Sequence, residues 1–260
     1  MKRTTILLFG IASYGIFFLS FLYLIAFLGN LQATPLAEQF PILKDLVPYS
    51  IDYGRETGNP VVAVLVNIGL VALFGVQHTV MARQGFKKAW TKIIPAAAER
   101  QVYVLLTSLI LILMYWQWRP IAEDIWDADT TVTYWLGWAV FGLGFGLVLL
   151  STFLINHFHL FGLQQSLWQF LGRTFGEPTF RTPFLYKVVR HPLYLGWFLA
   201  FWGGPVMTCG HMLFAIGMCG YILIAIRYEE KDLKSFHPEY SKYAEQVPML
   251  VPMPGKSYQG

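Results

Sequence analysis

Four long apolar runs dominate this sequence, at residues 6–28, 61–81, 102–118 and 134–156. An α-helix rises 1.5 Å per residue, so about 20 apolar residues cross the hydrocarbon core of a bilayer. Backbone polar groups cannot remain unpaired in lipid, and a helix pairs them within the segment itself. The runs therefore predict an all-α integral membrane protein.

A shorter pair of apolar runs follows, at residues 193–207 and 212–226, separated by residues 208–211. Each run has about 15 residues, which is marginal for a straight span. We expect a C-terminal helical hairpin that turns near the far membrane interface. The predicted architecture is about four full transmembrane helices plus this hairpin.

Composition and charge support this interpretation. Hydrophobic residues make up 55% of the chain and charged residues only 13%, which excludes an ordinary soluble domain. Sixteen of the 19 basic residues fall at the termini and in two alternate connections, and the remaining three are Lys44, Arg55 and Arg119. The positive-inside rule then places both termini in the cytoplasm, in a multi-pass protein of a bacterial inner membrane. Basic residues spread between apolar runs do not indicate a nucleic-acid partner, so membrane lipids are the expected surroundings.

The connection at residues 158–190 contains an amphipathic stretch in which leucine and aromatic residues alternate with glutamine and serine. We expect this stretch to lie against the membrane surface until Gly172 ends it. Cys209 and Cys219 have no metal-ligand spacing, so we expect apolar packing there and no metal site.

The segment from Arg190 to Gly196 carries a candidate site. Pro192 favours an extended residue before it and suits the first position of a helix. Unpaired N–H groups and the small Gly196 then lie where a polar ligand can approach. The alternative is that Arg190 and His191 only anchor the helix among lipid headgroups.

Glu229 and Glu230 stand at the end of the second hairpin helix, which runs back towards Arg190 and His191. Adjacent carboxylates near a membrane interface are costly unless they are paired, solvated or bound to a ligand. A carboxylate can accept hydrogen bonds from ribose hydroxyls or balance a cation. The alternative is pairing with Lys231 and Lys234 on a solvated helix face.

A family resemblance rests on these residues together with the C-terminal tail. Three segments occur in the order found in the isoprenylcysteine carboxyl methyltransferase and phospholipid methyltransferase superfamily. They are the segment from Tyr186 to Gly196, the Glu229-Glu230 pair and the segment 236–252. That resemblance implies a membrane bundle that binds S-adenosylmethionine at its cytoplasmic end. The residues it implies for cofactor binding are Tyr186, Val188, His191, Tyr194 and Gly196, with Glu229 or Glu230 towards the ribose or amino-acid end.

The upstream sequence narrows the resemblance. Several upstream segments resemble the methanethiol S-methyltransferases, which share a membrane domain with NnrU-like proteins. These segments are residues 74–83, the set Pro95, Glu99, Arg100 and Tyr103, and residues 116–120 and 156–164. This implies transfer of a methyl group from S-adenosylmethionine to methanethiol, giving dimethyl sulfide and S-adenosylhomocysteine. It also implies one methyltransferase domain, with a substrate-side bundle at residues 1–157 and cofactor-binding elements at 158–260.

The attacking species in such a reaction is a thiolate, and a cysteine thiol has an unperturbed pKa of about 8.5. A positive neighbour or a general base would therefore help. The candidate catalytic residues are His159, His78, Arg190 and Asn156, with His159 ahead of His78. On a continuous helix Asn156 and His159 would share a face, whereas His157 would point elsewhere and serve packing or the membrane interface.

Three other functions remain open from the sequence. The C-terminal signature also suits a methyltransferase for a lipid or a prenyl-cysteine. Sterol reductases carry a similar Arg-His-Pro-x-x-x-Gly hairpin and bind a nicotinamide cofactor. A non-catalytic NnrU-like accessory protein would need neither the paired glutamates nor Arg190. The oligomeric state is not indicated by the sequence.

Overall fold

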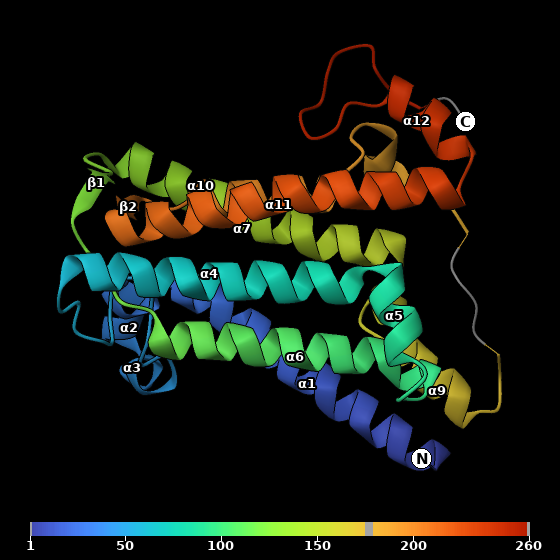
Figure 1. Ribbon diagram of the computed structural model, residues 1–260. Helices are drawn as coiled ribbons and strands as arrows, with labels where there is room; N and C mark the ends of the chain where they lie inside the picture. Colours follow the sequence, from blue (N-terminus) through green and yellow to red (C-terminus); the bar gives the residue numbers. More distant parts are fainter. Residues whose placement is uncertain (1, 175–178, 259–260) are drawn as a thin grey trace. The chain divides into compact units, whose positions relative to one another are not determined.

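The computed structural model describes residues 2–174 and 179–258, and Figure 1 shows the order of its elements. The long helices are α1 (Arg3–Leu28), α4 (Pro60–Ala82), α6 (Ala96–Gln117), α7 (Thr131–Ile155) and α11 (Cys209–Phe236). The shorter helices are α2 (Pro35–Gln39), α3 (Ile42–Leu46), α5 (Gln84–Trp90), α8 (His157–Leu160), α9 (Leu163–Phe170), α10 (Pro192–Trp202) and α12 (Glu239–Gln246). Two 3₁₀ turns, η1 (Leu31–Ala33) and η2 (Phe184–Lys187), and two strands, β1 (Asp124–Asp127) and β2 (Val206–Thr208), complete the order.

The four long apolar runs are confirmed as helices, and two of them, α4 and α7, begin with side-chain caps. Asn59 accepts hydrogen bonds from the N–H groups of Val61 and Val62, with Pro60 in the first turn of α4. Thr130 and Thr133 form a reciprocal capping box at the start of α7. With these caps, α4 and α7 begin slightly before their apolar runs.

The second helix of the predicted hairpin is longer than its apolar run. Helix α11 has 28 residues, and it is one of five helices long and apolar enough to cross a membrane among the described residues. The apolar run ends at Ile226, but the charged residues that follow it are good helix formers, so the helix continues to Phe236. The protein is thus a multi-pass membrane protein with five helices of spanning length and the shorter α10.

Helix α10 packs along α7 at a close crossing. A Cβ added at Gly144 would lie 2.3 Å from the backbone nitrogen of Ala200, and one at Gly196 would lie 2.8 Å from the carbonyl oxygen of Gly144. Small residues of this kind let two helices in a membrane approach closely. Beyond α10 the chain continues along α7 without helix, and Gly204 N–H donates to the carbonyl of Gly137.

The two strands were not predicted. β1 pairs antiparallel with β2, with Asp127 opposite Val206 and Trp126 opposite Met207. Each strand has only three or four residues, too few to produce a recognisable period-two pattern.

The amphipathic stretch in the connection after α7 forms helix α9, and its place against the membrane surface stays a prediction. Gly172 follows it with φ of 70°, a left-handed conformation that suits glycine, and Arg173 N–H bonds back to the carbonyl of Trp168. Residues 175–178 of this connection lie outside the described residues.

Contacts divide the chain into two compact units. One contains residues 1–127, 158–175 and 206–217, and the other contains residues 128–157, 176–205 and 218–260. The first has buried aromatic packing around Trp118, with Phe214 at 5.7 Å and Phe27 at 6.3 Å between ring centroids. The second contains the α7–α10 crossing and a cluster of Tyr240, Tyr243 and Val247 in the C-terminal segment.

Candidate functional site

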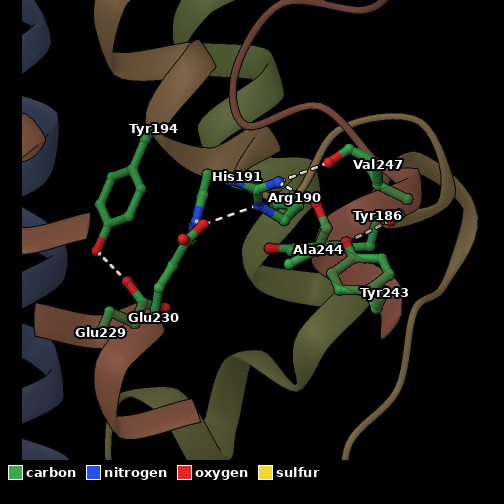
Figure 2. Close-up of polar contacts among 9 residues, drawn as sticks. All are labelled: Tyr186, Arg190, His191, Tyr194, Glu229, Glu230, Tyr243, Ala244 and Val247. Atoms are coloured by element: carbon green, nitrogen blue, oxygen red, sulfur yellow. Dashed lines mark hydrogen bonds and ion pairs between the residues drawn. The ribbon is translucent and has the colours of Figure 1, made fainter. Parts of the chain in front are cut away.

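The residues of the Arg190 to Gly196 motif and the paired glutamates meet in the second unit. Pro192 takes the first helical turn of α10 as expected, whereas His191 before it has φ of −127° and ψ of 64° and is not fully extended. Figure 2 shows the start of α10 facing the Glu229-Glu230 end of α11. The prediction that α11 brings its glutamates back to Arg190 and His191 is therefore confirmed.

Glu230 is held by two basic side chains. Its Oε1 atom accepts a hydrogen bond from Arg190 Nε at 2.8 Å and lies 2.9 Å from His191 Nε2. The side chains of Arg190 and Glu230 are 14% and 15% exposed, and that of His191 is 5% exposed. A charge pair so little exposed to water is screened less than a surface pair, so its geometry matters for the local structure.

Glu229 has different surroundings. The hydroxyl of Tyr194 donates to its Oε2 atom at 2.7 Å. Among the described residues, Glu229 has no cationic partner, and its Oε1 atom accepts no hydrogen bond. Glu229 is half-buried, so this carboxylate retains an acceptor that a ligand can use.

Arg190 also binds the C-terminal segment. Its Nη1 atom donates to the carbonyl oxygens of Ala244 and Val247, each at 2.7 Å, at the end of α12. The backbone N–H groups of Arg190 and His191 donate to the carbonyls of Pro248 and Met249, at 2.9 and 3.1 Å. The guanidinium thus satisfies carbonyls that lack helical partners and lies at the favourable end of the α12 dipole.

Three tyrosines close to these contacts remain protonated. Burial raises the pKa of Tyr186, Tyr240 and Tyr243, and the Glu229 carboxylate raises that of Tyr186 further. The hydroxyl of Tyr243 donates to the carbonyl of Tyr186, which links α12 to the 3₁₀ turn η2. The predicted residue Tyr186 is therefore part of the same cluster.

The two other residues predicted beside the cofactor lie differently. Val188 follows η2 and is 40% exposed. Gly196 is buried against α7, and this contact accounts for a glycine at that position without a ligand. Their roles in cofactor binding stay predictions.

His78 belongs to a separate polar cluster in the first unit. Its Nε2 atom lies 2.7 Å from the hydroxyl of Tyr103, and its Nδ1 atom lies 3.4 Å from Thr107 Oγ1. Arg100 covers the Tyr103 ring, with Cζ 5.1 Å from its centroid, and its Nε donates to the carbonyl of Leu160. Polar side chains inside apolar helices are costly, which makes this cluster a functional candidate.

The expected shared face of Asn156 and His159 is wrong. Helix α7 ends at Ile155, and Asn156 has φ of 153°, so the two residues do not follow each other on one helix. Asn156 belongs to the second unit and His159 to the first. The expected packing role of His157 is supported, because it is buried with Nδ1 2.8 Å from Thr152 Oγ1 and its ring stacks on Phe153.

Sequence reasoning missed two parts of these clusters. Tyr103 was named only as part of the family resemblance, and Thr107 was not named, although the two are four residues apart on α6 and this spacing places them on one helix face. The backbone carbonyls of Ala244 and Val247 carry no sequence signal, because any residue supplies a carbonyl.

Comparisons with known proteins extend over nearly the whole chain. Methanethiol S-methyltransferase 2 of Bradyrhizobium diazoefficiens is 47% identical across 96% of this chain and 91% of that protein. The methanethiol S-methyltransferase of Crocosphaera subtropica is 44% identical across 98% of this chain and 95% of that protein. The corresponding protein of Mycobacterium tuberculosis is 44% identical across 98% of both chains.

The chain is also similar, at lower identity, to proteins called nurim. Nurim of Xenopus laevis is 26% identical across 68% of this chain and 65% of that protein. No sequence-family model and no solved structure matches the chain. Because the similarity to these methyltransferases covers nearly the whole chain, the chain belongs to the methanethiol S-methyltransferase family.

Proposed function

We propose that this protein transfers a methyl group from S-adenosylmethionine to methanethiol, which yields dimethyl sulfide, S-adenosylhomocysteine and a proton. The observation that carries this proposal is the family membership, which extends over nearly the entire chain. The substrate is a small thiol that enters a membrane protein with five spanning helices. We further propose a bacterial inner-membrane location with both termini in the cytoplasm.

The chemistry of the second unit fits this methyl donor. The donor carries ribose hydroxyls and an ammonium group, all of which seek acceptors, and Glu229 has a half-buried carboxylate oxygen without a donor among the described residues. Tyr194 donates a hydrogen bond to this carboxylate, and the charge of the carboxylate interacts with Tyr186. Bound in this position, S-adenosylmethionine would supply a methyl group already activated by its sulfonium sulfur.

The chain's own residues then have three tasks in this proposal. Tyr194 orients the Glu229 carboxylate, because its hydroxyl occupies one of the two oxygens. Aromatic and aliphatic side chains reduce water around the reacting groups, which favours alignment of the thiol with the methyl carbon. The thiol proton must also leave, and His78, His159 and Asn156 remain the candidates for assisting that step.

The proposed activity can be tested on detergent-purified protein. We expect dimethyl sulfide, measured by gas chromatography, to form from methanethiol and S-adenosylmethionine. N-acetyl-S-farnesylcysteine and phosphatidylethanolamine serve as alternative acceptors for the prenyl-cysteine and lipid hypotheses. Methylation of either alternative with none of methanethiol would overturn the proposal.

Calorimetric titration separates the methyltransferase from a reductase. We expect binding of S-adenosylhomocysteine and none of NADPH. Binding of NADPH alone would favour the nicotinamide alternative, and a protein that binds neither ligand would favour the accessory function.

A further inference from the structure

A basic pocket lies in the first unit, where the end of α9 meets the start of α1. Figure 1 shows α9 beside the N-terminal part of α1, and the two helices are in contact. The pocket has a volume of about 300 Å³, near the lower end of the roughly 300–1,000 Å³ that small ligands fill. Its lining residues are Arg3, Gln169, Gly172, Arg173 and Thr174. Two guanidinium groups therefore border one open space.

The backbone at the end of α9 brings these two arginines together. Gly172 has φ of 70°, and the chain turns there so that Arg173 N–H donates to the carbonyl of Trp168. A Cβ added at Gly172 would lie 3.1 Å from Arg3 Nη1. The Arg3 guanidinium therefore lies against the turn that positions Arg173.

The positive charges of this pocket are not balanced within the described residues. No carboxylate is among the described lining residues, and neither Arg3 nor Arg173 forms an ion pair with a described residue. The first turn of α1 has no acidic residue and no side-chain cap, so the helix dipole adds partial positive charge there. Like charges that border one pocket repel each other, and an anion between them removes the repulsion. The pocket is therefore suited to an anionic ligand.

The apolar side chains of α9 indicate the source of that anion. Leu167, Phe170 and Leu171 are exposed at the C-terminal end of this helix, next to the pocket. On a helix that lies along the membrane surface, as predicted for α9, such side chains enter the acyl-chain region while polar groups stay at the depth of the lipid phosphates. Basic pockets at this depth on the cytoplasmic side, the side predicted for this one, bind anionic lipid headgroups.

We propose that this pocket binds the headgroup of an anionic phospholipid such as phosphatidylglycerol. Arg3 and Arg173 donate to the phosphate oxygens, which suit the planar fork of donors that a guanidinium presents. Gln169 and Thr174 offer uncharged hydrogen-bonding groups to the glycerol hydroxyls. A zwitterionic headgroup fits less well, because its ammonium group would meet two positive charges and no carboxylate among the described lining residues. The bound lipid holds the start of α1 against the end of α9, and this site is independent of the proposed methyl transfer.

Two pairs of variants test the site. Arg3→Gln and Arg173→Gln remove one charge each, whereas Arg3→Lys and Arg173→Lys keep the charge without the fork of donors. Lys88→Gln is the matched control, because Lys88 is an exposed cation of α5 in the same unit and on the same predicted side of the membrane. Arg3 and Arg173 are exposed, so all five variants should melt as the wild type does in lipid-free detergent.

Lipid binding is measured on detergent-purified protein by native mass spectrometry, in titrations with phosphatidylglycerol and with phosphatidylcholine. We expect the wild type to bind phosphatidylglycerol about tenfold more tightly than phosphatidylcholine, and Arg3→Gln and Arg173→Gln each to lose about tenfold for phosphatidylglycerol alone, as loss of a charge-assisted hydrogen bond implies. The two lysine variants should recover part of this affinity. Lys88→Gln should bind both lipids as the wild type does.

Thermal melting gives a second measurement of the same binding. A ligand that binds only the folded state stabilises it, so added phosphatidylglycerol should raise the Tm of the wild type and of Lys88→Gln. The rise should be smaller in Arg3→Gln and in Arg173→Gln.

Three results would overturn the proposal. The first is equal affinity of the wild type for the two lipids. The second is a loss of phosphatidylglycerol affinity in Lys88→Gln as large as in the glutamine variants of the arginines, which would indicate attraction by overall charge. The third concerns glycerol 3-phosphate, which carries a phosphate without acyl chains. If it displaces an equal concentration of phosphatidylglycerol, the ligand is a soluble phosphoester and the lipid assignment is wrong.

Discussion

Asp52 shows how a single carboxyl group can make the stability of this protein depend on pH. It lies in the loop after α1, where its two oxygens accept from Thr208 Oγ1 at 2.6 Å and Asn30 Nδ2 at 3.1 Å. Burial raises its pKa from 3.8 to about 6, although the Thr208 hydrogen bond opposes the shift. The folded protein therefore takes up a proton at Asp52 at higher pH than the unfolded chain does.

The sign of the resulting effect follows from proton linkage. A carboxyl group with a raised pKa destabilises the folded state above that pKa, and the penalty disappears as pH falls towards 3.8. We expect Asp52→Asn to melt higher than wild type at pH 7.5, by several degrees, since about 1 kcal/mol shifts Tm by roughly 2–4 °C in a protein of this size. The difference should shrink towards pH 5. Asp45→Asn is the control, because Asp45 is an exposed carboxylate of helix α3 in the same connection.

Tyr103 provides a second test at the scale of one residue. Tyr103→Phe removes the hydroxyl that lies 2.7 Å from His78 Nε2. If His78 assists the thiol, kcat/KM for methanethiol should fall at least tenfold while the Kd for S-adenosylhomocysteine stays unchanged. Tyr23→Phe is the control, because it removes a hydrogen bond to the carbonyl of Tyr49 elsewhere in the same unit. Full activity in Tyr103→Phe would show that the reaction does not depend on the contact between Tyr103 and His78.

At the scale of elements, the crossing of α7 and α10 positions the residues that follow Arg190. The closeness of the two helices depends on Gly144, where an added Cβ would meet the backbone of Ala200 at 2.3 Å. A backbone atom cannot move aside as a flexible side chain can. The pair of helices must therefore separate if any side chain is added there.

Gly144→Ala should accordingly lower the free energy of unfolding by about 1–3 kcal/mol, the usual cost of overpacking. Gly146→Ala on the same helix is the matched control, because a Cβ there meets nothing within 4 Å. Alanine also favours helix over glycine by roughly 0.5–1 kcal/mol, so the control should be neutral or slightly stabilised. Thermal melting in detergent measures both, and equal melting of the two variants would contradict the close crossing.

At the scale of the whole molecule, membrane topology depends on whether the segment after α10 completes a crossing. Helix α10 has 11 residues, which is too short to span a bilayer alone. Its non-helical continuation remains along α7, where Gly204 bonds to Gly137 and Ala128 bonds to Pro205. Irregular backbone is tolerated at membrane depth when protein covers it. If this path completes a crossing, it makes an even number together with the five long helices of the described residues.

Both termini should therefore lie on the same side of the membrane. We expect a fluorescent protein fused after residue 258 to fold and fluoresce, and alkaline phosphatase inserted between residues 30 and 59 to be active. The concentration of lysine and arginine in the alternate connections sets the direction. An active phosphatase fused at the C-terminus would contradict the predicted orientation.

Much of the architecture could be predicted from the sequence because hydropathy is a local property. The runs at residues 6–28 and 134–156 became α1 and α7 with shifts of a few residues at their ends. The turn chemistry at Pro192 and Gly172 was local as well, and it was confirmed. The meeting of His191 with Glu230 followed from the antiparallel return of the chain and needed no side-chain detail.

The remaining features depended on contacts between distant residues. Helix α7 stopped at Ile155, and two short strands paired across about 80 residues of sequence. Each outcome is set by packing or backbone hydrogen bonds that no local pattern contains. The sequence alone determined a multi-pass helical membrane protein with a conspicuous glutamate pair. Only the tertiary structure decided that Glu230 pairs with Arg190 while Glu229 keeps an open oxygen, because partners 40 residues apart are chosen by three-dimensional geometry.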